Sequence, residues 1–352
     1  MSPRNWLLGA LFTLIEVLFV NPLQAAEVPL TFLPFAESLG GDVRCVQGPH
    51  GDYSHAGTLE YAYDFDLGSG PNDDTNPAYG VAVYAPFTGE VVDVRTGVPD
   101  FSNNSSSNSL NNNGLGNTVQ LKVTGNAGTT YYVRFAHFQS GSIPSTVRVG
   151  AIISQGTRIG RIGQTGYSTT PHLHIHMSTT AGGSSIEFEF AEGPVTTGTW
   201  ITPRLRSGRF IVDNDGRATL GFPLSSVSTY LVSGTWSNYT WRSYTFGYNY
   251  RGSTSTSAKF RWRFNYTVPS LTNVRLNIYA SCTNNTGRDR SAAYAITRGT
   301  TTLNRTVDQR TIGTSPVLIG TVTLSGGINT ISVQGQRSAN TFCADALIID
   351  RI

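Results

Sequence analysis

Apolar and polar residues alternate in short runs along most of the chain, and Gly, Pro, Asn and Ser separate these runs. A period of two residues is typical of a β-strand with one buried face, whereas an amphipathic helix repeats about every 3.6 residues. No helical period is sustained beyond the N-terminal segment. The pattern predicts an all-β protein, with strands at 81–87, 89–96, 117–125, 130–138, 172–177, 261–268, 274–282, 315–324 and 329–335.

One predicted strand has three histidines at alternate positions. The stretch "TTPHLHIHM" at 169–177 holds three of the six histidines in the chain. In an extended conformation His172, His174 and His176 share one face, and the apolar residues between them share the other. The apolar face can pack into a core, so the histidine face must meet water, a ligand or a metal.

Two irregular segments divide the chain. Pro99–Gly116 is rich in Asn and Ser and predicts a long surface loop between two strands. Glu192–Gly208 is rich in Thr, Gly and Pro and lacks a clear period, as linkers do. We therefore expect a first domain at 27–200, a linker at 201–208 and a second domain at 209–352. All six histidines precede the linker.

Composition agrees with an extracytoplasmic β protein. Charged residues make up only 13% of the chain, and Gly, Ser, Thr and Asn are abundant. The net charge is +3, and no Lys/Arg cluster is dense enough to indicate a nucleic-acid partner.

The N-terminus predicts a secretory signal peptide at 1–26. Arg4 precedes the apolar run "WLLGALFTLI", and small residues follow at a suitable cleavage site. An uncleaved anchor helix is the alternative, and Glu16 within the apolar region argues against it. We expect a secreted or periplasmic protein with no stable membrane span after cleavage. In such an oxidising compartment Cys282 and Cys343 could pair, which would leave Cys45 unpaired.

Several segments supply groups that can bind a metal. His-x-His on a strand offers two nitrogens on one face, and a catalytic zinc site needs three protein ligands with one position open. The run "SHAGTLEYAYDFDLG" adds His55 and Asp64, and "YYVRFAHF" ends with His137. Seen alone, each of these residues has a plain interpretation as a turn, strand-end or solvated side chain. Together they make a metal site the better interpretation.

In this order the segments resemble the lysostaphin/LytM-type zinc endopeptidases, and the β-lytic group among them. The matching motifs are "SHAGTLEYAYD", "FAH" and "QTGYSTTPHLH", and "VRVGAIISQGTRIGRIGQTG" resembles the Gly-rich hairpin of that family. The resemblance covers roughly residues 43–177. It implies an antiparallel β-sheet peptidase domain.

The resemblance also implies the chemistry. It makes His55, Asp64 and His174 the ligands of one Zn²⁺ per chain, and His137 and His172 the catalytic histidines. The expected activity is that of a zinc metalloendopeptidase that hydrolyses peptide bonds in bacterial cell-wall peptidoglycan through a metal-activated water. Either catalytic histidine could serve as base, proton donor or oxyanion donor.

Two positions depart from the family pattern. The interval between His55 and Asp64 is longer than in the short form of the motif, and His50 is a second histidine in that region. We expect His55 to be the ligand because of its "SH" context. His176 stands where the family often has Glu. It shares the ligand face, so it could support a metal ligand from behind or be a residue at the rim of the site, and we favour the rim.

The second half resembles a golvesin C-terminal-type module, through "FIVDNDG", "SGTWS", "TVDQR", "VLIGTVTL" and "CADALIID". This resemblance implies a β-sandwich of jelly-roll type. Two roles remain open for it: a stabilising appendage, or contact with a glycan or cell surface.

Two rival functions were weighed. A cupin-type metal oxygenase also uses His-x-His on a strand, but it needs a Glu a few residues later, and none occurs before Glu187. A non-catalytic cell-wall or glycan-binding protein on a peptidase-like fold is the stronger alternative. Occupation of all five key positions favours the enzyme.

Overall fold

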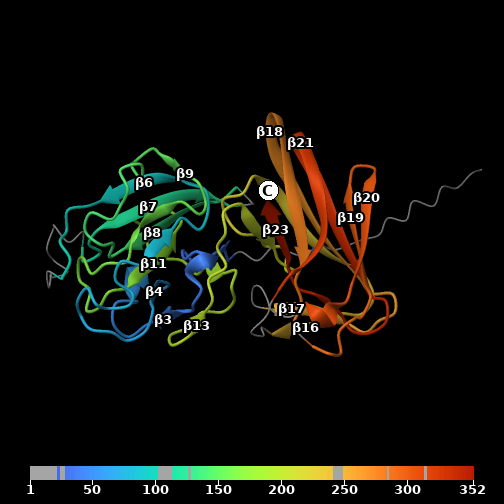
Figure 1. Ribbon diagram of the computed structural model, residues 1–352, viewed down its shortest axis with the longest axis horizontal. Coiled ribbons are helices and arrows are strands. Elements are labelled where there is room, and N and C mark those ends of the chain that lie inside the picture. Colours follow the sequence, from blue (N-terminus) through green and yellow to red (C-terminus); the bar gives the residue numbers. More distant parts are fainter. Residues whose placement is uncertain are drawn as a thin grey trace, which may run out of the picture.

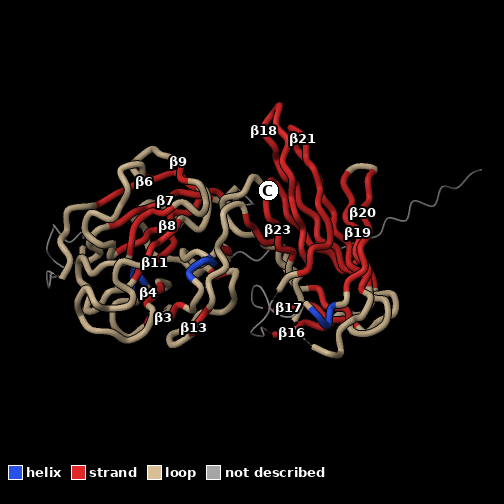
Figure 2. The backbone as a smooth tube through the Cα atoms, viewed as in Figure 1, coloured by secondary structure: helices blue, strands red, loops and turns tan. Residues whose placement is uncertain are grey.

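The computed structural model describes residues 22–23, 28–101, 113–125, 128–240, 249–283, 285–312 and 315–352. Almost all of the predicted signal peptide, and most of the predicted Asn/Ser-rich loop, lie outside these ranges. No helix within them is long and apolar enough to cross a membrane. Two groups of strands lie side by side, and strands dominate both (Figures 1 and 2).

The first group is an eight-stranded sheet in which every adjacent pair is antiparallel. Two short two-stranded sheets accompany it. The strand order in the large sheet is β13 (Trp200–Ile201), β3 (Val43–Gln47), β4 (Tyr63–Asp66), β11 (Leu173–Ser178), β8 (Thr130–Ala136), β7 (Thr118–Thr124), β6 (Gly89–Arg95) and β9 (Ile152–Ile153). The small sheets pair β5 (Ala82–Tyr84) with β10 (Arg158–Arg161), and β2 (Leu30–Thr31) with β12 (Glu189–Phe190).

Alternation along β11 decides which face of this sheet is the core. Leu173, Ile175 and Met177 are fully buried and belong to one apolar cluster with side chains from β3, β4, β7 and β8. The intervening His174 and His176 therefore face the other side of the sheet. The sequence pattern predicted this division correctly.

The second group is a larger sheet with a small three-stranded sheet packed near it. Apolar side chains from both sheets form one buried cluster, as in a sandwich. The large sheet contains β1 (Pro22–Leu23), β14 (Arg209–Val212), β15 (Leu224–Ser233), β18 (Lys259–Ala280), β19 (Ala292–Arg298), β20 (Thr301–Val307), β21 (Val317–Gln336) and β23 (Leu347–Arg351). The small sheet contains β16 (Ser237–Thr240), β17 (Asn249–Ser253) and β22 (Phe342–Ala344).

The all-β prediction is confirmed, with one correction to the strand list. The sequence predicted four separate strands where the structure has only two, β18 of 22 residues and β21 of 20 residues. These two strands pair with each other along most of their length, and a register shift between Val268 and Asn273 absorbs the polar residues that suggested a break. Leu271, within that shift, is fully exposed with a φ of 64°. The helical segments in the part of the chain described are short 3₁₀ turns, at Glu37–Leu39, Gly57–Leu59 and Gln309–Thr311.

The cysteines are buried thiols in this structure. Cys45 lies in the core of the first sheet, where burial and the nearby Asp64 carboxylate raise the pKa of its thiol to about 12. A thiol that stays protonated is a poor metal ligand. Cys282 and Cys343 lie in the same core cluster of the second sheet, and the possible link between them stays a prediction.

An apolar cluster joins the two groups of strands. Its seven buried side chains come from both sides of the predicted linker and from Leu205 within it. Leu30, Phe32 and Ala191 come from the first part, whereas Ile211, Ala346 and Ile348 come from the second. The predicted domain boundaries stay a prediction, but the contact between the two parts is a buried one.

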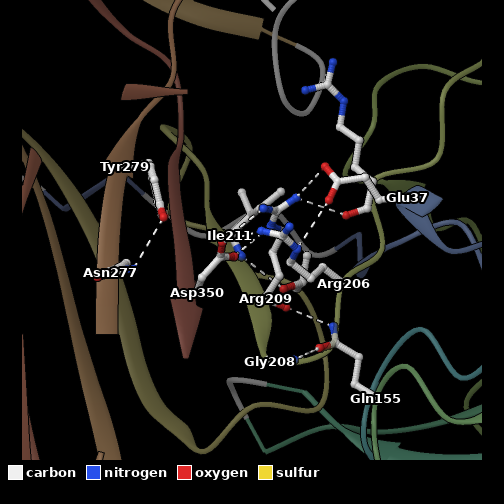
Figure 3. A network of polar contacts seen from close by, with 11 residues as sticks. Glu37, Gln155, Arg206, Gly208, Arg209, Ile211, Asn277, Tyr279 and Asp350 are labelled. Atoms are coloured by element: carbon white, nitrogen blue, oxygen red, sulfur yellow. Dashed lines mark hydrogen bonds and ion pairs between the residues drawn. The ribbon is translucent and has the colours of Figure 1, made fainter. Parts of the chain in front are cut away.

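A network of polar contacts also joins the two groups of strands (Figure 3). The guanidinium of Arg209 donates to both carboxylate oxygens of Asp350, at 2.8 and 3.0 Å, and lies 3.1 Å from Glu37. Arg206 approaches the same two carboxylates, at 3.4 and 3.5 Å. The amide of Gln155 donates to the backbone carbonyl of Arg209 and accepts from the backbone N–H of Gly208, each at 2.9 Å. The predicted linker is therefore anchored to both parts.

Arg209→Ala should lower the free energy of unfolding by about 3 kcal/mol, because it leaves the buried Asp350 carboxylate without the guanidinium that binds both of its oxygens. Arg206→Ala is the matched control. Arg206 contacts the same two carboxylates, but its side chain is 59% exposed, so its removal should cost less than about 1 kcal/mol. Urea unfolding followed by circular dichroism measures both. Equal effects of the two substitutions would contradict the assignment of Arg209 as the buried anchor.

Candidate metal centre

Strand pairing places two of the predicted ligands opposite each other. The antiparallel register of β4 and β11 sets Asp64 directly across from His174. Their side chains project from the face opposite the core, and Oδ1 of Asp64 lies 2.9 Å from Nδ1 of His174. Both residues are almost completely buried.

The third predicted ligand arrives from a loop. His55 lies between β3 and the 3₁₀ turn at Gly57–Leu59, and it is fully buried. Its Nδ1 donates to the backbone carbonyl of Gly48 at 2.9 Å, so the lone pair of the neutral ring is on Nε2. That Nε2 lies 3.2 Å from Oδ2 of Asp64 without making a hydrogen bond, and it has no other hydrogen-bond partner. A buried nitrogen in this state is suited to a metal.

The three side chains fit a divalent metal. One potential ligand atom from each of His55, Asp64 and His174 lies within 4.8 Å of the others. Burial alone would raise the pKa of Asp64, but the imidazoles of His172, His174 and His55 hold it well below its usual value. Burial lowers the pKa of His174, although Asp64 acts in the opposite direction. Burial lowers the pKa of His55, but Asp64 outweighs this effect and the pKa is raised, so a metal at this site would displace a proton from His55. A carboxylate with deprotonated imidazole nitrogens is the donor set that zinc prefers.

The two predicted catalytic histidines lie together on one side of these ligands. The ring centroids of His137 and His172 are 4.6 Å apart, and Nε2 of His172 is 3.7 Å from Oδ2 of Asp64. Nδ1 of His137 donates to the carbonyl of Thr165, and Nδ1 of His172 donates to that of Thr170, each at 2.8 Å. In both neutral rings Nε2 is therefore the basic atom.

His137 is held in a strained conformation. It follows β8 with a φ of 61°, a region that residues other than Gly rarely occupy. Burial and the neighbouring imidazoles of His172 and His174 lower the pKa of His137 to about 3. Backbone strain of this kind persists only where the surroundings fix it, and it concentrates at functional sites.

The surroundings of His137 are a hydrogen-bonded loop pair that sequence reasoning did not single out. Asn117 donates to the carbonyls of Val98 and Phe138, and the Thr165 hydroxyl donates to Phe138 while accepting from the backbone of Asn117. The "QTG" motif was the available signal. A Cβ on Gly166 would lie 2.4 Å from backbone atoms of the adjoining loop, so only Gly allows this approach.

His50 lies apart from the cluster. Its side chain is 60% exposed, and its Nδ1 lies 2.9 Å from the carboxylate of Glu60. The structure thus brings His55, and not His50, to Asp64. The ligand and catalytic roles themselves stay predictions.

The expectation for His176 is wrong. We expected a residue at the rim, but His176 is only 3% exposed, and its Nδ1 lies 2.9 Å from Nε2 of His174. Burial, His174 and the guanidinium of Arg134 hold the pKa of His176 well below its usual value. Alternation gives the face of a residue but not its depth, and loops on both sides of β11 cover this position.

Two family models match different parts of the chain. Residues 73–187 match the model of Peptidase family M23, and residues 224–351 match the Golvesin C-terminal domain. No curated protein matches the sequence. Of the predicted site residues, His137, His172 and His174 lie inside the M23 match, whereas His55 and Asp64 precede it.

Several solved structures are similar to the first part of the chain. The catalytic domain of a mutant of the prophage-encoded M23 protein EnpA from Enterococcus faecalis is 18% identical, with a TM-score of 0.29, and the match covers 41% of this chain and 88% of that one. The catalytic domain of the antimicrobial peptidase lysostaphin from Staphylococcus simulans is 23% identical, with a TM-score of 0.27, over 42% and 90%. A zinc-containing peptidase from Vibrio cholerae is 21% identical, with a TM-score of 0.27, over 42% and 36%. These TM-scores are low, so the family rests on the two sequence-model matches.

The match to Peptidase family M23 places the first part of the chain, with its antiparallel sheet and buried His–Asp–His cluster, among the metallopeptidases. More particularly, the chain combines a domain of peptidase family M23 with a Golvesin C-terminal domain.

The two histidines of the His-x-His pair should respond differently to substitution. His174→Ala should abolish stoichiometric zinc binding, because only two ligands remain. His172→Ala should keep zinc, because Nε2 of His172 is 3.7 Å from the carboxylate and outside the ligand set. Metal analysis after dialysis, with circular dichroism to confirm folding, measures both. Zinc lost in His172→Ala but retained in His174→Ala would reverse the assignment.

Proposed function

We propose that this protein is a secreted or periplasmic zinc metalloendopeptidase that hydrolyses peptide bonds in bacterial peptidoglycan. The observation that carries the proposal is the buried cluster of His55, Asp64 and His174, with His137 and His172 beside it, in a chain that contains an M23 domain. The motifs shared with the lysostaphin/LytM-type endopeptidases suggest the substrate.

His55, Asp64 and His174 would hold the metal. When bound, zinc supplies Lewis-acid polarisation of a scissile carbonyl and activation of water. The remaining chemistry falls to this chain's own side chains. The protein must exclude bulk water from the ligands, and the burial of all three does so.

His137 and His172 would move protons. Each ring keeps its Nδ1 proton on a backbone carbonyl, so Nε2 of each ring carries the lone pair. One Nε2 can take a proton from the attacking water, and the other, once protonated, can donate to the leaving amine or to the developing oxyanion. Because both rings are fixed through Nδ1, neither needs to reorient before reaction, which favours catalysis by positioning.

A non-catalytic wall-binding protein is the alternative function. It requires neither a metal nor the pairing of His137 with His172, so the structure gives it no specific support. For the Golvesin C-terminal domain we propose an accessory role, either contact with a glycan or cell surface, or stabilisation of the first domain through their shared apolar cluster.

Purified protein should cleave peptide bonds in isolated peptidoglycan and in soluble muropeptides, and each cut should release a new amino group. Mass spectrometry of the fragments identifies the bond. A chelator should abolish cleavage, and added zinc should restore it. His137→Ala should lower turnover by about 10²–10⁴-fold.

His50→Ala is the control, since the exposed His50 lies outside the cluster, and it should keep full activity. Binding to the wall without release of any new amino group would support the alternative function. Cleavage that survives the chelator would contradict a metallopeptidase.

A further inference from the structure

The four histidines around Asp64 differ in the group that accepts the proton of the neutral ring. A neutral imidazole that offers one nitrogen to a metal or proton must carry its own proton on the other nitrogen, and that proton needs an acceptor. His55, His137 and His172 each place it on a backbone carbonyl, of Gly48, Thr165 and Thr170 respectively. These three carbonyls lie in loops, where the sheet ladder does not use them.

His174 cannot place its proton on a loop carbonyl. It lies within β11 and pairs with β4 on one side and β8 on the other, so the backbone groups near it serve the sheet. Its Nδ1 lies 2.9 Å from Oδ1 of Asp64, so without a metal it donates to that carboxylate, and it is the atom that a metal shared with Asp64 would bind. When a metal takes Nδ1, the proton of the neutral ring must reside on Nε2, which is buried.

The acceptor within hydrogen-bond distance of Nε2 is another side chain. Nδ1 of His176 lies 2.9 Å from Nε2 of His174, because residues two apart on a strand share a face. The two rings meet edge to face, with centroids 5.2 Å apart.

The ring of His176 is itself held in place. Arg134 of β8 is the cross-strand partner of His176, and its guanidinium is anchored by Asp93 at 2.9 Å and Gln120 at 3.1 Å. His176, Arg134 and Gln120 line a cavity of about 470 Å³ beside the metal site. His176 therefore lies between its partner His174 and a cavity that side chains of β6, β7 and β8 also line.

We propose that His176 is a positioning residue for the metal centre. Its Nδ1 accepts the Nε2 proton of His174, which fixes both the orientation and the tautomer in which His174 presents Nδ1 to the metal. The inference rests on the proposed function, because it takes His174 to be a metal ligand.

A matched pair of substitutions separates this role from simple packing. His176→Asn places a carbonyl oxygen where Nδ1 was, and it keeps the acceptor. His176→Leu has the same branching at Cγ but cannot accept a hydrogen bond. The first readout is zinc affinity of the full chain, measured by competition with a chelator of known affinity. Loss of an outer partner of a ligating histidine typically weakens metal binding about 10–100-fold.

We expect His176→Leu to bind zinc about 10–100-fold more weakly, and His176→Asn to bind it nearly as tightly as the unchanged protein. The second readout is the Nε2–H proton of His174 in zinc-loaded protein labelled with ¹⁵N on its histidines alone, with His174→Gln to assign the signal. A hydrogen bond to His176 should protect this proton from exchange with solvent in the unchanged protein and in His176→Asn, and the protection should be lost in His176→Leu.

Equal zinc affinity in the Leu variant and the unchanged protein would overturn the inference and leave the proposed function intact. Equal weakening in both variants would also overturn it, since packing and not the acceptor would then matter. Absence of zinc binding by the unchanged protein would overturn the inference together with the proposed function.

Discussion

The pairing of β4 with β11 is the constraint on which the site depends. Its register sets Asp64 opposite His174, and a shift of β11 by one residue would turn His174 into the core. The apolar face of β11 prevents such a shift, because Leu173, Ile175 and Met177 fill the interior of the first sheet. The same residues that stabilise the fold therefore determine which side chains can meet a metal.

Around this pair, each imidazole has one nitrogen at hydrogen-bond distance from a fixed partner. Loop carbonyls serve His55, His137 and His172, and the strand residue His174 turns to His176. Loops are hence as necessary as the sheet. The strained φ of His137 and the close approach at Gly166 show how tightly one of these loops is held. Binding sites built this way are rigid before any ligand arrives.

Much of this could be predicted from the sequence. A period of two residues gave the strands and the faces of β4 and β11, and motif order brought His55, Asp64, His137, His172 and His174 into one hypothesis. Burial depth could not be predicted, because it depends on which loops cover a face, so His176 was misplaced. The predicted strand lengths were wrong for β18 and β21, because a paired strand can continue through a polar interruption by means of a register shift.

The contact between the two parts was also beyond prediction from the sequence. The composition of residues 192–208 indicated only an irregular linker, but Leu205 enters a shared apolar cluster, and Gly208 and Arg209 form hydrogen bonds with Gln155. Residues distant in the chain make these contacts, and no local pattern reveals them. A substitution at this contact can therefore act on the first domain without touching its site.

We propose that His55, Asp64 and His174 bind one zinc ion, and anomalous diffraction at the zinc absorption edge, on crystals of the zinc-loaded full chain, tests this proposal. We expect one anomalous peak, about 2.0–2.2 Å from Nε2 of His55, Nδ1 of His174 and a carboxylate oxygen of Asp64. A peak coordinated by His176 or His50 instead, or no peak within reach of Asp64, would contradict it.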